Sequence, residues 1–205
     1  MEKRILKSVE KSQGKLYLML LARDPEYFWD NVNTIVGDPF KETEIESLKV
    51  PESVVYLEHA LKDNQTLKSL EILGHADFGR GSFSNIPTLK KVKGEFVTVV
   101  GENAFKNCEN LQEVKMPRVI RLCSGAFKNC KSLKLLDMPA LNRIEYGACD
   151  GCENLKVKCY PWQVSFMENY FGRERLVMAT NKDAQTYLEQ LRENTIREFN
   201  MVKEF

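Results

Sequence analysis

Apolar residues recur along this chain with a period of 22 residues. The clearest copies begin at Ala104, Ala126 and Ala148, and each continues through Phe or Cys, then Cys, then Leu at equivalent positions. The same spacing extends backward through Phe83 and Leu61, so that five units superimpose without an insertion. A repeat of this length is typical of a solenoid, in which each unit forms one coil.

Each unit also contains a short alternating segment that predicts a strand. Leu111, Val114 and Met116 show apolar spacings of three and then two, which fits a turn that enters a strand with alternate side chains facing inward. A second inward pair follows at Val119 and Leu122. Its equivalents in other units are Val97 with Val100, Leu141 with Ile144, and His75 with Phe78. Each coil therefore contributes two walls to a shared core.

The segments that flank the repeats are predicted to cap the stack, because one coil cannot bury its own apolar edge. Asp24 and Pro25 provide an N-cap and a first-turn proline, and apolar residues including Val32 and Ile35 follow before Gly37. This pattern predicts an amphipathic helix that closes the first coil.

At the other end, residues 162–180 keep only part of the pattern, since Phe171 and Val177 still hold the 22-residue spacing. We interpret them as a degenerate last coil. Residues 181–205 show apolar positions at helical spacing and predict an amphipathic helix. This helix is expected to dock on its own chain, and a homodimer through residues 181–205 is the alternative.

Length and composition favour one continuous domain. The chain has 205 residues, of which 43% are hydrophobic. We divide it into a helical N-terminal cap at 1–40, repeats at 41–161, the last coil at 162–180 and the helix at 181–205. Charge is balanced, with 30 basic and 29 acidic residues, so no overall field favours nucleic acid or an anionic membrane.

The N-terminal sequence lacks the features of a secretory signal peptide, and the apolar run from Leu16 to Ala22 is too short to span a bilayer. We therefore expect no membrane insertion and a chain that stays in the compartment where it is made. Surface display or secretion would need a missing leader or an unconventional route. The six cysteines are then expected to be reduced.

The repeated unit closely resembles the leucine-rich repeats of the BspA-like (Treponema pallidum type) family. The motif is Leu111-x-x-Val114-x-Met116-Pro117, followed by Ile120, Gly125-Ala126-Phe127 and Cys130-x-x-Leu133. The resemblance covers residues 45–161. It implies an α/β repeat solenoid, a right-handed coil of about five to six units with a β-sheet along one face, a helical N-terminal cap and a C-terminal helix. It also implies a protein-binding role, often that of an adhesin.

The cysteines allow two interpretations. Cys149 and Cys152 form a C-x-x-C, and together with Cys159 they are candidate thiolate ligands for zinc or a redox pair. However, Cys149 and Cys152 fall at the inward positions of Phe105 and Cys108, which favours packing in the core. Cys123 and Cys159 fall at positions that Glu145 and Lys115 or Asp137 occupy in other units, so these two thiols are predicted to be exposed.

Catalytic motifs are not evident. The only histidines are His59 and His75, and the inward position expected for His75 does not suit a catalytic triad. The glycine-basic turns at 79–82 and 172–173 lack the spacing and lysine of a P-loop. We therefore expect a non-enzymatic protein without a cofactor, whose partner is another protein.

The outward positions of the predicted strands supply the candidate partner-binding residues: Lys91, Lys93, Glu113, Lys115, Leu135, Asp137 and Val157. These positions form either a solvated sheet face without a ligand or a contact patch. Leu135 and Val157 lie near the aromatic segment 160–171 and favour a patch at the C-terminal end.

Arg121 and Arg143 are a further candidate, because they lie one repeat apart and so should be neighbours on adjacent coils. Such a pair suits a carboxylate or phosphate. The alternative is a surface ion pair with Glu145. Three classes of function thus remain open: a protein-binding module, a self-assembling protein that dimerises through its C-terminal helix, and a cysteine-based metal or redox protein.

Overall fold

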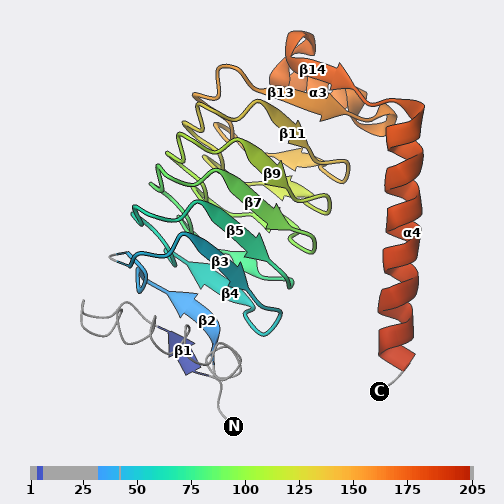
Figure 1. Ribbon diagram of the computed structural model, residues 1–205. Coiled ribbons are helices and arrows are strands. Elements are labelled where there is room, and N and C mark those ends of the chain that lie inside the picture. The colour runs from blue at the N-terminus through green and yellow to red at the C-terminus, as the bar shows by residue number, and fades with distance from the viewer. Residues whose placement is uncertain (1–3, 7–31, 42, 204–205) are drawn as a thin grey trace.

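The computed structural model describes the backbone of residues 4–6, 32–41 and 43–203, and the side chains of 32–41 and 43–196. Over these residues the chain forms a parallel β-solenoid with a long helix after its last coil, as the sequence predicts (Figure 1). The helix runs alongside the stack of coils, back toward the N-terminal end (Figure 1).

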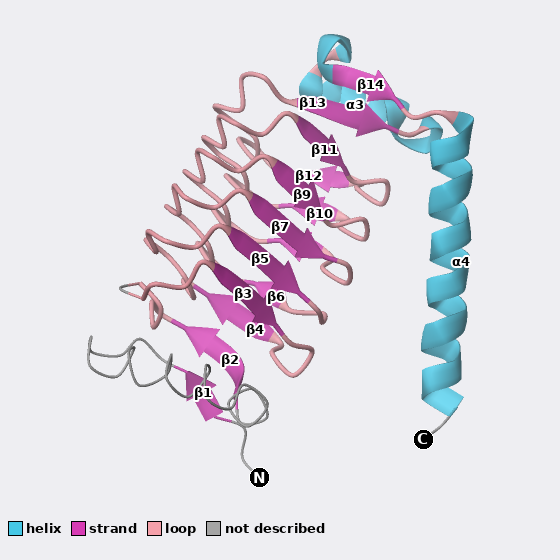
Figure 2. Ribbon diagram, in the orientation of Figure 1, coloured by secondary structure: helices cyan, strands magenta, loops and turns pink. Residues whose placement is uncertain are grey.

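The main wall is a seven-stranded parallel sheet with the strand order β14-β13-β11-β9-β7-β5-β3 (Figure 2). Neighbouring strands come from successive coils, so each pairs with the strand one repeat away. The strands are β3 (Ser47–Val50), β5 (Ser69–Ile72), β7 (Lys91–Gly94), β9 (Glu113–Lys115), β11 (Leu135–Asp137), β13 (Lys156–Cys159) and β14 (Leu176–Met178).

The second wall consists of two shorter parallel sheets with the orders β1-β2-β4-β6 and β12-β10-β8. Their strands are β1 (Arg4–Leu6), β2 (Val32–Val36), β4 (Tyr56–Glu58), β6 (Asp77–Phe78), β8 (Val99–Val100), β10 (Arg121–Leu122) and β12 (Arg143–Ile144). After β13 the chain forms η1 (Pro161–Gln163), α3 (Val164–Phe171) and η2 (Arg173–Arg175), then β14 and α4 (Asn181–Lys203).

The core between the walls is built from columns of equivalent residues. Phe83, Phe105 and Phe127 are fully buried and stack with ring centroids 5.2 and 5.4 Å apart. Offset stacking of this kind adds to the stabilisation from apolar burial. The Sγ atoms of Cys108 and Cys130 each lie 3.1 Å from a carbonyl oxygen of the preceding coil, at Phe83 and Phe105 respectively. The cysteine column therefore packs as part of the core and donates hydrogen bonds between coils.

A ladder of polar side chains runs beside this core. Asn129 donates to Asn107 at 2.8 Å, Asn107 donates to Asn85 at 2.7 Å, and Asn85 donates to Asp63 at 2.7 Å. All four residues have positive φ, from 58° to 62°, a conformation that Asn and Asp tolerate better than most residues. The repeated Asn therefore serves both the turn of its own coil and the bond to its neighbour.

The prediction of an unbroken 22-residue spacing is wrong at β13. Leu136 pairs with Val157, 21 residues away, so Val157 and Cys159 point inward and are fully buried. The turn leucine precedes the first inward strand residue by three positions at Leu133, but by two at Leu155. Because side chains alternate along a strand, this one-residue shift exchanges its two faces. The predicted outward positions of Val157 and Cys159 are therefore wrong.

Two further positions differ from expectation. His75 is exposed and packs against Phe96 with centroids 5.1 Å apart, because Ala76 and Phe78 are the inward residues of that coil. Val32 and Ile35, expected in a helix, lie in β2, which pairs with β4. Their β-branched side chains favour a strand, and the neighbouring coil supplies its hydrogen-bond partners. The start of that expected helix, residues 24–31, lies outside the described residues.

Candidate binding surface between the sheet and the C-terminal helix

The outward side of the main sheet, from β3 to β13, is called the strand face. Its predicted candidates Lys91, Lys93, Lys115 and Leu135 are exposed, while Glu113 and Asp137 are half-buried. Val157 is not part of it, and Lys156 and Lys158 take the outward positions on β13. The strand face is therefore basic at its C-terminal end. The unbroken repeat predicted an apolar C-terminal end, and that prediction is wrong.

Lysines outnumber acidic residues on this face. Its six lysines are Lys49, Lys91, Lys93, Lys115, Lys156 and Lys158, and its three acidic residues are Glu71, Glu113 and Asp137. Ion pairs connect several of them across adjacent strands. Glu113 lies 3.4 Å from the Nζ of Lys91 and 3.1 Å from that of Lys115, so one carboxylate serves two lysines. These two hydrogen bonds lower the pKa of Glu113.

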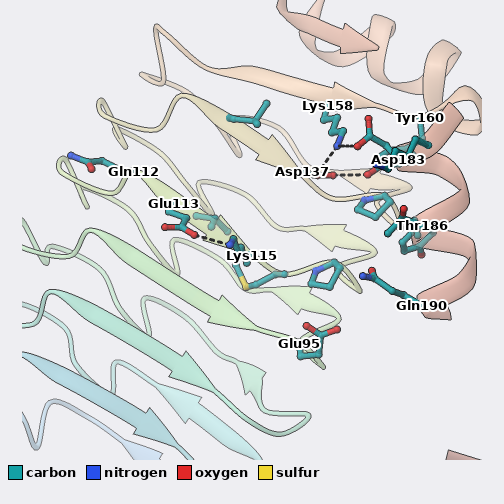
Figure 3. Close-up of a pocket in the computed structure, with 17 residues that line it drawn as sticks. Glu95, Gln112, Glu113, Lys115, Asp137, Lys158, Tyr160, Asp183, Thr186 and Gln190 are labelled. Atoms are coloured by element: carbon teal, nitrogen blue, oxygen red, sulfur yellow. Dashed lines mark hydrogen bonds and ion pairs between the residues drawn. The ribbon is translucent and has the colours of Figure 1, made fainter. Parts of the chain in front are cut away.

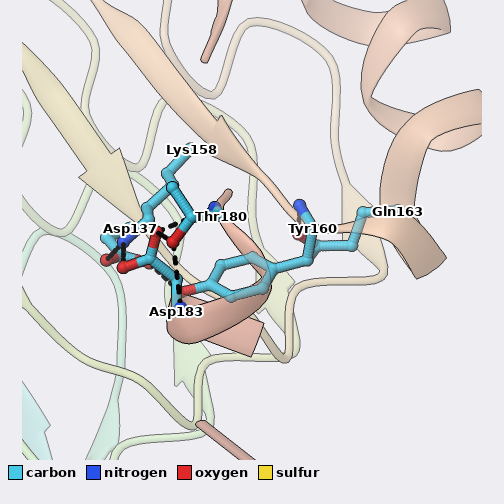
Figure 4. Close-up of polar contacts among 6 residues, drawn as sticks. All are labelled: Asp137, Lys158, Tyr160, Gln163, Thr180 and Asp183. Atoms are coloured by element: carbon cyan, nitrogen blue, oxygen red, sulfur yellow. Dashed lines mark hydrogen bonds and ion pairs between the residues drawn. The ribbon is translucent and has the colours of Figure 1, made fainter. Parts of the chain in front are cut away.

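Lys158 connects the strand face to α4 (Figure 4). Its Nζ lies 3.2 Å from Asp137 on β11 and 2.8 Å from Asp183 in the first turn of α4. Tyr160 donates a hydrogen bond of 2.9 Å to the other oxygen of Asp137. Partial burial lowers the pKa of Lys158, but its bonds to Asp183 and Asp137 outweigh this effect and raise it overall. The bond from Lys158 is also the main cause of the lowered pKa of Asp183.

The start of α4 is fixed by a capping box at Thr180 and Asp183. The Asp183 carboxylate accepts hydrogen bonds from the backbone N–H and the hydroxyl of Thr180, at 2.8 and 2.7 Å. In return, the Thr180 hydroxyl oxygen accepts from the Asp183 N–H at 3.1 Å. One turn later, Tyr187 lies beside Tyr160 and Trp162, with ring centroids 6.0 and 5.9 Å apart. The N-terminal turns of α4 are thus held on the solenoid.

Farther along α4, apolar side chains are exposed. Leu188, Leu191 and Ile196 keep 52%, 43% and 50% of their surface accessible. Leu188 and Leu191 border a hollow of about 480 Å³ against Leu141, Trp162 and neighbouring residues. The expected docking of the helix on its own chain therefore involves its first turns, while part of its apolar stripe remains accessible within residues 181–196.

A cavity of about 610 Å³ lies between the strand face and α4 (Figure 3). Strands β9 and β11 provide one side, with Lys115 and Leu135, and α4 provides the other, with Thr186, Tyr187 and Gln190. A smaller hollow of about 310 Å³ continues along the strand ends, beside Leu73, Lys93 and Phe96. Both hollows are lined by Glu95 and Lys115, so together they form one groove. We call this the strand-face groove.

A model of the BspA type leucine rich repeat region matches residues 33–156 of this sequence, in six copies. The chain belongs to this BspA-type leucine-rich-repeat family. The match covers more than half of the 205 residues and confirms the resemblance inferred from the repeated motif. A comparison with curated protein sequences gave no match.

Two solved structures resemble this BspA-type chain. A leucine-rich repeat protein from Bacteroides ovatus is 23% identical, with 74% of this chain covered and a TM-score of 0.55. A leucine-rich repeat protein from Eubacterium ventriosum is 25% identical, with 59% of this chain covered and a TM-score of 0.52. The chain spans 46% and 34% of those two proteins, which is less than half of either. The similarity supports the solenoid fold.

The other predicted candidates lie away from the strand-face groove. Arg121 and Arg143 are paired in register on β10 and β12, in the second wall of this BspA-type solenoid. The Nε of Arg121 donates to Glu145 at 3.0 Å, and this contact both raises the pKa of Arg121 and lowers that of Glu145. The ion pair suggested as the alternative is therefore present, and Arg143 alone is exposed.

The candidate metal ligands Cys149, Cys152 and Cys159 are all buried. The thiol of Cys152 donates to the carbonyl of Phe127 at 3.0 Å, and burial raises the pKa of Cys149 well above its usual value. Cys123, predicted to be exposed, is half-buried. Within the described part of the chain, no group of three or more His, Cys, Asp or Glu residues is arranged to hold a metal ion.

Sequence reasoning missed the residues that hold the groove together. Lys156 and Lys158 were not among the predicted strand-face residues because the spacing was taken as unbroken, although the shorter interval after Leu155 is visible in the sequence. Asp183 and Tyr187 were placed on the predicted helix, but no sequence pattern indicated that Asp183 pairs with Lys158 on β13 or that Tyr187 packs beside Tyr160 and Trp162. The described helices include none that is both long and apolar enough to cross a membrane.

Proposed function

We propose that this protein is a non-enzymatic protein-binding module whose partner occupies the strand-face groove. The observation that supports this most directly is the cavity of about 610 Å³ between the strand face and α4. Binding pockets in proteins commonly have volumes of roughly 300 to 1,000 Å³ and combine apolar walls with a few polar groups. Leu135 and Tyr187 supply apolar surface here, and Lys115 supplies charge.

The groove suits recognition because its walls are held rigidly. One wall is a parallel sheet whose strands are fixed by backbone hydrogen bonds to both neighbours. The other is the part of α4 held by Asp183 and Tyr187. A preorganised site loses little conformational entropy when a partner binds. The residues lining the larger cavity include no serine, cysteine or histidine that would serve as a nucleophile or its base.

A pull-down from cells of the source organism and from its neighbours tests the proposal. Thr186→Trp would place a large side chain in the cavity, whereas Gln185→Trp adds the same side chain at an exposed position on α4 outside its lining. A partner recovered by the wild type and Gln185→Trp, but lost with Thr186→Trp, supports the proposal. A partner that all three recover equally would place the binding site elsewhere. Where the partner is a surface protein of another cell, the same groove would serve adhesion.

Self-association through α4 is a second candidate function, supported by the exposed Leu188 and Leu191. A helix of 23 residues with such a stripe provides about three heptads for pairing with a second copy. Light scattering would show a dimer for the wild type and a monomer for Leu188→Glu/Leu191→Glu. A monomeric wild type would rule this function out.

A further inference from the structure

We infer that the open edge of strand β14 binds an extended segment of a protein partner as an additional strand of the main sheet. β14 is the last strand of that sheet, and among the described strands it pairs with β13 alone (Figure 1). This edge is separate from the strand-face groove, because none of the residues of β14 lines either hollow of the groove. The inference therefore goes beyond the proposed function.

The free hydrogen-bonding groups of this edge belong to Leu176 and Met178. The N–H of Ala179 donates to the last carbonyl oxygen of β13 at 2.8 Å, so Ala179 faces β13. Backbone groups alternate in direction along a strand, so Val177 also faces β13, while Leu176 and Met178 face away from it. The N–H of Leu176 is satisfied by the carbonyl oxygen of Arg173. The described chain supplies no partner for the Met178 N–H or for the carbonyl oxygens of Leu176 and Met178.

The sequence of β14 leaves this edge unprotected. Edge strands commonly carry a charged side chain, a proline or a bulge, which prevents another strand from pairing with them. Leu176, Val177 and Met178 include no charge and no proline, and their pairing with β13 has no bulge. Each of the other six strands of the main sheet carries at least one lysine, glutamate or aspartate. β14 differs from them in presenting an edge that is apolar throughout.

Two side chains of β14 are exposed, one on each face of the sheet. Val177 pairs with Lys158, so it lies on the outward side, and 46% of its surface is accessible. Met178 pairs with the buried Cys159, so it lies on the core side, yet 56% of its surface is accessible. Met178 is exposed because no described strand lies beyond it in the sheet. An added strand would cover both side chains, and the burial of their apolar surface would favour binding.

The free groups of the edge determine the chemistry of its occupant. They comprise two acceptors and one donor, so a segment meets all of them with two N–H groups and one carbonyl oxygen. An extended chain supplies this set from two residues separated by one, in a parallel or an antiparallel orientation. The side chains beside Val177 and Met178 then belong to adjacent residues of the segment. The occupant is thus a short extended segment with two adjacent apolar residues, preferably β-branched and not proline.

A second copy of β14 fits this edge less well than a separate segment does. Each copy offers one free N–H, so two copies could form at most two hydrogen bonds and would leave two carbonyl oxygens without donors. Stable interfaces also bury on the order of 1,200 Å² or more, far above what two strands of three residues bury when they pair. A segment of another protein forms all three bonds and covers both exposed side chains.

Fluorescence anisotropy on the full chain tests the inference. The probe is a short labelled peptide with two central valines flanked by threonines. Its control is the same peptide with N-methyl groups on both valines, which removes a required N–H in either register. We expect the control to bind at least about tenfold more weakly. Binding of the unmethylated peptide should change little with salt, because the contacts are backbone hydrogen bonds and apolar surface.

Substitutions in β14 locate the bound peptide. Val177→Lys places a charge beside the added strand, and Met178→Pro removes the free N–H without removing a bond to β13. Each should weaken binding by about tenfold or more. Ile120→Lys is the matched control, because Ile120 is 43% exposed and precedes β10 in the second wall, and it should leave binding unchanged. Circular dichroism would establish that the variants are folded.

Hydrogen exchange of single amides gives a readout that does not depend on affinity. The N–H groups of Val177 and Ala179 face β13, whereas that of Met178 is free. Saturation with the peptide should therefore slow exchange at Met178, because its amide gains a hydrogen bond.

Three results would overturn the inference. The first is no binding of the valine peptide, or equal binding of its methylated control. The second is unchanged exchange at Met178 when the peptide is bound. The third is a wild-type dimer in light scattering that Val177→Lys converts to a monomer, which would place a second copy on the edge. The proposed function is tested by Thr186→Trp at the groove, so it and this inference can fail separately.

Discussion

Val157→Ala should destabilise the protein far more than Lys156→Ala, although an unbroken repeat predicts the opposite order. Val157 is fully buried between β11 and β14, where it pairs with Leu136 and Leu176. Alanine removes the equivalent of two methylene groups, worth about 0.8 kcal/mol each, and leaves a small cavity. We therefore expect a loss of about 2 kcal/mol in the free energy of unfolding.

Lys156 lies on the exposed side of the same strand. Its Nζ donates one exposed hydrogen bond, 2.7 Å long, to the carbonyl oxygen of Glu174. Losing such a bond costs less than about 1 kcal/mol when water can replace it. Leu135→Ala is a second control, because Leu135 is 44% exposed and is the residue that the strict spacing equates with Val157.

Urea unfolding followed by far-UV circular dichroism would measure these differences. The comparison is direct if the slope of the transition stays constant, because the midpoint then reports stability alone. A second transition in Val157→Ala would mean that the last coil unfolds separately, as nearest-neighbour coupling in a solenoid allows. A larger loss in Lys156→Ala than in Val157→Ala would refute the assigned register of β13.

Three other predictions follow from contacts at α4, in the ladder and around the thiols. Hydrogen bonds from Lys158 and Thr180 lower the folded-state pKa of Asp183 below its unfolded value of about 3.9, so its stabilisation of α4 is present above about pH 4 and is lost on further acidification. Hydrogen exchange of α4 should show this loss, and Asp183→Asn should weaken α4 at neutral pH and remove the acid dependence. Asn107→Ala breaks two ladder bonds and places alanine at a φ of 61°, so chemical denaturation should show a loss of about 2 to 3 kcal/mol, with a smaller loss for Asn107→Gly. A thiol reagent should modify Cys123 first, whereas the five buried cysteines should react only on unfolding; modification of all six at one rate would contradict their burial.

The repeat predicted the main features of the fold because the same contacts recur in every coil. Phe105 and Cys108 were placed correctly in the core, since their equivalents occupy the same position one coil away. The family match and the seven-stranded sheet confirm the solenoid. A periodic pattern averages over its copies, however, and so it hides local departures. His75 and Val157 were misplaced for this reason, at coils where the spacing to the next inward residue changes.

The groove was beyond the reach of sequence periodicity for a different reason. Its two walls come from segments about 45 to 70 residues apart, and the contacts between Lys158 and Asp183 have no equivalent in other coils. The helix α4 was predicted, because amphipathic spacing is a local property. Its position over β9 and β11 depends on the angle at which the chain leaves β14, and no repeated residue pattern records that angle.

The shifted strand β13 shows how this protein alters one coil without disturbing the next. The interval from the turn leucine to the first inward residue is shortened by one at Leu155, and a residue is regained before Gln163. Gln163 is buried and bonds the carbonyls of Met138 and Leu141, so the following element resumes contact with the preceding coil. The shift in repeat spacing is thus confined to the four residues of β13. A one-residue shift that is recovered within the same coil can exchange the outward side chains of a single strand, here placing lysines beside α4. Such a shift lets a binding surface diversify while the other coils of the stack keep their register.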